Sequence, residues 1–189
     1  MLRVPAPWSP SDFSGVAVTD TVRRTLSRMR KDGEIVGIGD ALVDLPNHVD
    51  MGLDPTAVLD ALTRRDGVRF VPTPRGAARA LGLVPMEPED ADGTIRVWCD
   101  AALNKGRPVR FVGFDLHAER HGPRAMSWAG NDAATLVQAL RHTGPIDAAM
   151  TVARATLAAS PRIRIGIKAN YGCLREDLRD ALRPVVWGT

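Results

Sequence analysis

The spacing of apolar residues predicts two helices in the first third of the chain. Ser9 and Pro10 are typical of a helix start, because a serine side chain can cap free amides and proline suits the first helical position. They predict a very short helix over residues 10–13. After Gly15, apolar side chains recur every three or four residues across residues 22–31, which predicts a helix of about three turns. Lys31 and Gly33 mark its end.

A change to short apolar runs after this helix predicts a β-hairpin. Residues 34–38 and 41–45 are two such runs, and Gly39-Asp40 lies between them as a turn. Pro46-Asn47 closes the second run, and we interpret residues 47–53 as a loop between two domains.

The remaining chain alternates predicted helices and strands. Cap residues and apolar stripes predict helices over residues 54–65, 73–82, 131–144, 145–160 and 174–182. Period-two patterns predict strands over residues 68–71, 94–99 and 108–116. Asn104-Lys105-Gly106 is expected to form the hairpin turn between the last two strands. Residues 85–93 are expected to form a loop. Residues 162–168 alternate isoleucine with arginine or glycine, and this period alone predicts a further strand.

These elements predict an α+β protein with two domains. Residues 1–48 would form a winged helix-turn-helix, because a short helix, a turn, a longer helix and a hairpin follow one another. Residues 52–189 would form a mixed α/β effector domain.

Composition narrows the class of protein only slightly. The chain has 189 residues, and its hydrophobic fraction of 44% is that of an ordinary globular protein. No apolar run approaches the length of a membrane span and the N-terminus lacks the core of a signal peptide, so we expect a cytoplasmic protein without a membrane partner. Cys99 and Cys173 are far apart and are interpreted as free thiols.

The predicted helix over residues 22–31 carries the clearest chemical signal. On a helical wheel Val22, Leu26 and Met29 form one narrow apolar stripe. The rest of the surface is polar or cationic: Arg23, Arg24, Ser27, Arg28, Arg30 and Lys31. Arginine suits both phosphate oxygens and the paired acceptors of guanine, so this helix and the hairpin resemble a DNA recognition helix and its wing. The alternative interpretation is an ordinary solvated charged face.

Several segments of the chain resemble a known family. PWSPSDF, TVRRTLSRMRKDGEIVGIGDALVDLP and LDPTAVLDALTRRDGVRFVPTPRGAARALGL are similar to the AbiEi-type antitoxin regulators of type IV toxin-antitoxin systems. LHAERHGPRAMSWAGNDAATLVQALRHTG and KANYGCLREDLRDALRPV are similar to the C-terminal part of that family. The resemblance covers nearly the whole chain.

The resemblance implies a winged helix-turn-helix that represses its own operon and a domain that serves antitoxicity. The implied partners are double-stranded DNA of the chain's own promoter and, as a functional partner, a nucleotidyltransferase-like toxin. From the residues themselves we expect no cofactor, no metal and no enzymatic activity. Residues 21–31 correspond to the recognition helix, so Thr21 joins the DNA-binding set, and residues 35–45 correspond to the wing. Only MLRVPA precedes PWSPSDF, where such regulators have a further helix. The family pattern also indicates a helix at residues 162–168, whereas the alternation of apolar and polar residues there predicts a strand.

One other cluster has the residue types of a catalytic or metal site. Asp115, His117, Glu119 and His121 lie at the end of a strand pattern, where residues four apart are about 13 Å distant, so we expect no metal site or catalysis there. The sequence has no phosphate-binding glycine loop and no nucleophile elbow. The alternative to a DNA-binding regulator is therefore a protein-interaction module whose degenerate winged helix does not bind DNA.

Overall fold

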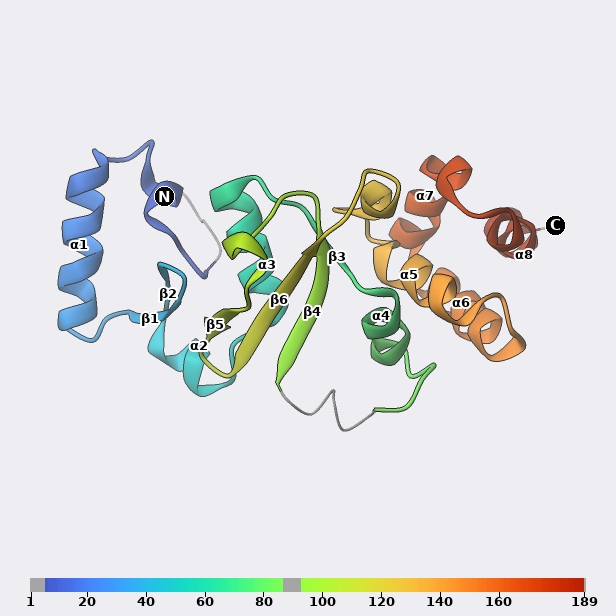
Figure 1. Cartoon of the computed structure of the whole chain (residues 1–189), viewed down its shortest axis with the longest axis horizontal. Helices are drawn as coiled ribbons and strands as arrows, with labels where there is room; N and C mark the ends of the chain where they lie inside the picture. The colour runs from blue at the N-terminus through green and yellow to red at the C-terminus, as the bar shows by residue number, and fades with distance from the viewer. Residues whose placement is uncertain (1–5, 87–92, 189) are drawn as a thin grey trace. The chain divides into compact units, whose positions relative to one another are not determined.

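The computed structural model describes residues 6–86 and 93–188, and within these ranges the protein has a mixed α+β fold (Figure 1). This part of the chain contains eight α-helices, a two-stranded hairpin and a four-stranded mixed sheet. The helices are α1 Thr19–Lys31, α2 Pro46–Asp50, α3 Pro55–Asp66, α4 Pro74–Ala80, α5 Ala134–Thr143, α6 Asp147–Ala159, α7 Pro161–Ala169 and α8 Glu176–Trp187. The strands are β1 Val36–Gly39, β2 Leu42–Asp44, β3 Phe70–Pro72, β4 Thr94–Cys99, β5 Val109–Phe111 and β6 Phe114–Arg120. Short 3₁₀ turns are η1 Pro10–Phe13, η3 Asn104–Gly106, η4 Ala125–Trp128 and η5 Tyr171–Cys173. The α+β prediction is confirmed at this level.

The described residues group into two compact units. The first unit contains residues 6–68, 93–95 and 104–117, and the second contains residues 69–86, 96–103 and 118–188. Strands β4 and β6 contribute residues to both units. The division into independent domains at residues 48 and 52 stays a prediction.

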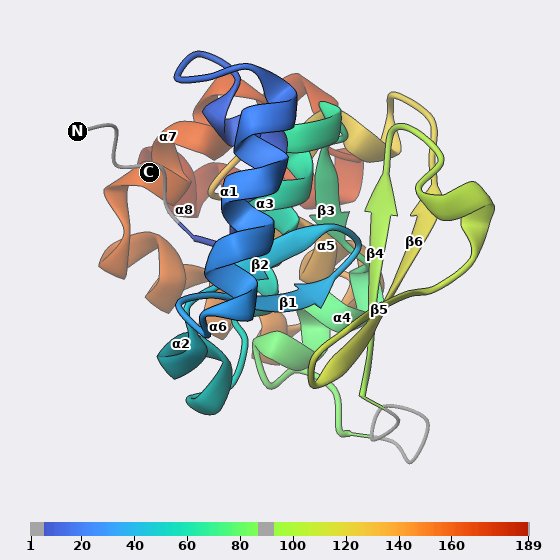
Figure 2. The same ribbon diagram turned by 90° about the vertical axis from the view of Figure 1, so that its left-hand side faces the viewer.

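The first unit contains the predicted hairpin, and α1 lies next to it (Figure 2). Strands β1 and β2 pair antiparallel, with Val36 opposite Asp44. The turn lies at Asp40 and Ala41, one residue later than expected, and both have positive φ angles of 45° and 59°. Such angles at both central residues match the twist of the flanking strands. The hairpin prediction is confirmed.

Side-chain caps account for the start of two further helices. The Asp54 carboxylate accepts a hydrogen bond from the Thr56 amide at 2.9 Å at the start of α3, and Gly67 ends that helix with a φ of 68°. The Thr73 hydroxyl accepts from the Gly76 amide at 3.1 Å at the start of α4. Each cap satisfies an amide that has no partner inside the helix. The predictions of α3 and α4 are confirmed.

The four-stranded sheet has the order β3-β4-β6-β5, which differs from the prediction. The Asp115 amide donates to Gly93 O and the His121 amide to Cys99 O, so β4 and β6 run parallel. Residues 108–116 do not form one strand, because Gly113 takes a φ of 90° and the chain turns back on itself between β5 and β6. Asn104–Gly106 is part of the connection from β4 to β5 and is not a hairpin turn.

The core of the second unit lies among its helices. Trp128 is completely buried, as are apolar side chains from α5, α6 and α8: Val137, Leu140, Ala149, Ala153, Leu178 and Leu182. Helix α4 packs on α5 through Ala77, Ala78 and Ala139, whose small side chains allow the helices to approach closely. The predicted helices over residues 131–144, 145–160 and 174–182 are confirmed as α5, α6 and α8.

Residues 162–168 form helix α7, so the strand prediction from their period is wrong. The Ser160 hydroxyl accepts a hydrogen bond from the Ile163 amide at 3.5 Å, and Pro161 occupies the first helical position. Ile167 is completely buried and Ile163, one turn earlier, is half-buried. Ile165 points away and is 66% exposed. The helix therefore buries two of its three isoleucines on one face and leaves the third in solvent.

Residues 46–50 form helix α2, where a loop was expected. The buried Asp44 carboxylate accepts hydrogen bonds from the Leu45 amide and from His48 Nδ1, both at 2.7 Å. Pro46 then suits the first helical position, as it does in the other helices that begin with proline.

Candidate nucleic-acid interface

Helix α1 is amphipathic, as predicted from its spacing. Val22 is buried, and Leu26 and Met29 are half-buried, so the apolar stripe faces the rest of the first unit. Short segment η1 packs against α1, and the Asp12 carboxylate of η1 accepts a hydrogen bond from the Ser9 amide at 2.7 Å. Arg64 of α3 also pairs with Asp12 at 3.1 Å and therefore ties η1 to α3. The stripe and these contacts fix which side of α1 faces outward.

The outward side of α1 carries every residue of the predicted DNA-binding set. Thr21, Arg23, Arg24, Ser27, Arg28, Arg30 and Lys31 are all exposed. Within residues 6–86 and 93–188, none of the five cations among them forms an ion pair. Five cations on about three turns of helix therefore present uncompensated positive charge to the solvent.

One of these cations also contacts the hairpin. A Cβ atom at Gly37 of β1 would lie 2.8 Å from an Nη atom of Arg30, so the Arg30 guanidinium fills the space that a side chain at position 37 would take. This contact joins the C-terminal turn of α1 to β1.

The tip of the hairpin is held by an ion pair from α3. Arg65 Nη2 donates to the Asp40 carboxylate at 2.6 Å, and it also contacts the Asp66 carboxylate at 2.6 Å. The hydrogen bonds that Arg65 donates to Asp66 and Asp40 raise its pKa well above the usual value, although burial opposes this shift. The hairpin is therefore fixed at its tip by α3 and at its base by Arg30.

The histidine and carboxylate cluster has no geometry for a metal ion. His117 and Glu119 lie on β6, and His121 directly follows the strand, with 3.6 Å between His121 Nε2 and Glu119 Oε2. His121 stacks on Trp98 with 4.0 Å between ring centroids. Among the residues that the structure describes, no three histidine, cysteine or acidic side chains are grouped to hold a metal ion.

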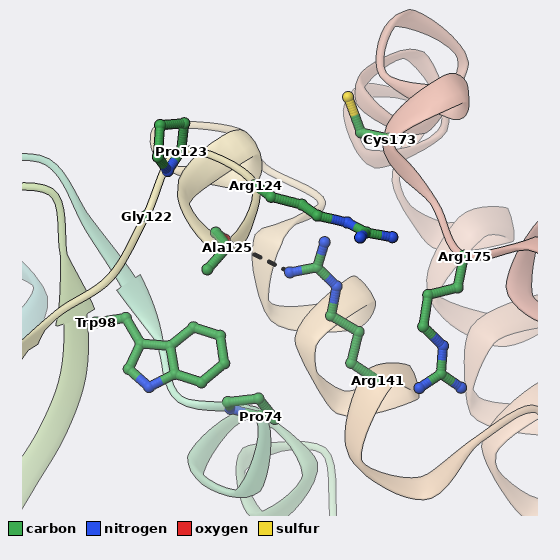
Figure 3. Close-up of a pocket in the computed structure, with 9 residues that line it drawn as sticks. All are labelled: Pro74, Trp98, Gly122, Pro123, Arg124, Ala125, Arg141, Cys173 and Arg175. Carbon is green, nitrogen blue, oxygen red and sulfur yellow. Dashed lines mark hydrogen bonds between the residues drawn. The ribbon is translucent and has the colours of Figure 1, made fainter.

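The second unit contains a pocket that the sequence did not predict (Figure 3). Three arginines from separate segments line it: Arg124 before η4, Arg141 on α5 and Arg175 before α8. Trp98 of β4 and Cys173 lie on its walls. These residues are up to 77 positions apart in sequence, counted from Trp98 to Arg175, so no local pattern could have found them.

Comparisons with protein-family models, with curated proteins and with solved structures find no match for the chain. Among the helices of residues 6–86 and 93–188, none combines the length and the apolar composition that a membrane span requires.

Proposed function

We propose that this protein is a DNA-binding transcriptional regulator in which η1, α1 and the β1–β2 hairpin form a winged helix-turn-helix. One observation carries the proposal: α1 turns its apolar stripe toward the rest of the first unit and exposes five cations that have no ion-pair partner in the described part of the chain. A charged face that served only solubility would gain from interspersed acidic partners. Uncompensated arginines on one helix face instead suit a polyanion.

The geometry suggests distinct roles within the set. Arg23, Arg24 and Arg28 extend from the exposed face of α1, where they can reach phosphates or guanine edges in a major groove. Arg30 lies over Gly37, so we assign it to holding the hairpin beside the helix as well as to charge. The short polar side chains of Thr21 and Ser27 allow the backbone of α1 to approach the DNA closely.

The antitoxin role extends this proposal and depends on the resemblance to AbiEi-type regulators. In this account the protein represses its own operon, and the C-terminal part of the chain serves antitoxicity toward a nucleotidyltransferase-like toxin. Such a regulator acts where the DNA is, so its expected location is the cytoplasm.

A binding experiment on the full chain tests the proposal. Fluorescence anisotropy with duplex DNA from directly upstream of the chain's own gene would measure Kd at low salt. We expect Arg24→Ala combined with Arg28→Ala to weaken binding by at least about tenfold, because each lost DNA contact of this kind costs about 1 to 3 kcal/mol. The matched control combines Arg154→Ala and Arg183→Ala, which remove the same charge from exposed positions on α6 and α8.

Two results would contradict the proposal. An equal loss in both double variants would assign binding to net charge rather than to α1. Absence of binding by the unmodified protein at low salt would favour the alternative, a protein-interaction module with a degenerate winged helix.

A further inference from the structure

The pocket of the second unit combines an apolar wall with three arginines among its lining residues. Its volume is about 560 Å³, which is in the range of small-molecule sites. Trp98, Pro74 and Pro123 supply the apolar part. Figure 3 shows the Arg124 and Arg141 side chains reaching toward the same part of the pocket from different elements.

Positive charge in this pocket is only partly compensated. Among the lining residues that the structure describes, none is an aspartate or a glutamate. Arg175 pairs with Asp177, with 3.0 Å between Nε and Oδ1, whereas Arg124 and Arg141 have no ion pair with any described residue. Two positive charges are therefore left over, which matches the charge of a phosphate monoester at neutral pH, about −1.5 to −2.

The guanidinium of Arg141 is surrounded by neutral and positively charged groups. It is half-buried, and its Nη1 atom donates to two neutral acceptors, Gln138 Oε1 at 3.3 Å and Ala125 O at 3.5 Å. Burial, followed by repulsion from Arg124 and Arg175, lowers the pKa of Arg141. A bound anion would offset both the burial and the repulsion.

Trp98 provides a flat surface beside these charges. His121 stacks on one face of its indole at 4.0 Å, so Trp98 offers the pocket its other face or its edge. The stacked pair holds the indole ring in place. Aromatic rings of ligands stack favourably on such a surface.

We propose that this pocket binds a phosphate monoester that carries a flat heterocyclic ring, as a 5′-mononucleotide does. Arg124 and Arg141 bind the phosphate, Arg175 adds to the positive potential, and Trp98 contacts the ring. Gln138, which is completely buried, positions Arg141 through its side-chain carbonyl. This site is separate from α1 and goes beyond the proposed DNA binding.

The two cysteines provide a readout that is specific to the pocket. Cys173 is exposed and lines the pocket, whereas Cys99 is buried. The experiment measures the rate at which iodoacetamide modifies Cys173 in the full chain, with 5′-AMP, adenosine or inorganic phosphate added, and Kd by calorimetry. At a 5′-AMP concentration ten times its Kd, we expect alkylation of Cys173 to slow by about tenfold.

Variants and ligand fragments decide the outcome. Arg124 is exposed, so Arg124→Gln should fold normally, and we expect it to weaken 5′-AMP binding by about tenfold. Arg162→Gln on α7 removes the same charge outside the pocket and should leave binding unchanged. We also expect 5′-AMP to bind more tightly than phosphate or adenosine alone.

Three results would overturn the proposal: no protection of Cys173, equal affinity for phosphate and 5′-AMP, or equal effects of Arg124→Gln and Arg162→Gln. The Arg24→Ala, Arg28→Ala variant should bind 5′-AMP normally. Failure of DNA binding and failure of nucleotide binding are thereby distinguishable.

Discussion

Of the two glycines in β1, Gly39 has the less room for a side chain. Its φ is +126°, a conformation that side chains rarely adopt, and an added Cβ would lie 2.2 Å from the backbone oxygen of Arg110. At the neighbouring residue, the Val112 amide donates to Ile38 O at 2.9 Å and joins β1 to the turn after β5. Gly39→Ala must therefore distort its own backbone and also push the hairpin away from this turn.

The backbone strain and the steric overlap at Gly39→Ala each lower the free energy of unfolding. Strained backbone costs about 1 to 3 kcal/mol, and overpacking against rigid neighbours costs about the same again, so we expect a loss of roughly 2 to 6 kcal/mol. That is a large share of the stability of a typical domain, about 5 to 15 kcal/mol. Because the distorted hairpin includes the proposed wing, DNA affinity should fall together with stability.

Gly33 supplies the matched control. Its φ is +74°, but nothing lies within 4 Å of an added Cβ. Gly33→Ala should cost only the backbone term, about 1 to 2 kcal/mol. Urea denaturation followed by circular dichroism would compare the two variants. Equal stability losses would refute the close approach of Gly39 to Arg110 and with it the described placement of the hairpin.

Two further predictions concern the second unit. Asp100 accepts hydrogen bonds from Arg69 N and Arg69 Nε at 2.9 and 2.7 Å, which lower its pKa below the ordinary value of 3.8. The ion pair stabilises the protein above the unfolded-state pKa of Asp100, and this stabilisation is lost as the pH falls through the lower pKa of the folded state. Asp100→Asn should therefore lower the melting temperature at pH 7 and match the unmodified protein in strong acid. A difference in melting temperature that does not change with pH would contradict the ion pair. Burial raises the pKa of Cys99, so iodoacetamide at pH 8 should modify only Cys173 in the native protein and both thiols in urea. Mass spectrometry would identify the modified thiols. Modification of Cys99 in the native protein would contradict its burial.

Local signals predicted most helices of this fold. The caps Asp54 and Thr73 and the terminating Gly67 act through hydrogen bonds or backbone angles within a few residues, so the sequence displays them directly. Alternation failed at residues 162–168, because a cap at Ser160 and burial of Ile167 outweighed a period of two. The pairing of β4 with β6 depends on tertiary contacts that no local pattern contains.

The cationic face of α1 could be predicted from the sequence, whereas the arginine pocket could not. The cationic face of α1 is continuous in sequence, and the wheel that placed Val22 inside also placed Arg24 and Arg28 outside, as the structure has them. The pocket arginines each look like an ordinary surface charge in the sequence. Only the packing of α5 near the segments before η4 and α8 brings Arg124, Arg141 and Arg175 to one cavity.

The salt dependence of DNA binding reports directly on whether α1 contacts DNA phosphates. Each phosphate contact contributes about 0.9 to the slope of log K against log salt concentration, so loss of Arg24 and Arg28 should make the slope shallower by about 1.8. Anisotropy titrations at several salt concentrations would give this slope for the unmodified protein, for Arg24→Ala with Arg28→Ala, and for the control with Arg154→Ala and Arg183→Ala. We expect a shallower slope for the α1 variant alone. Identical slopes for all three proteins would contradict the assignment of α1 as the DNA-binding helix.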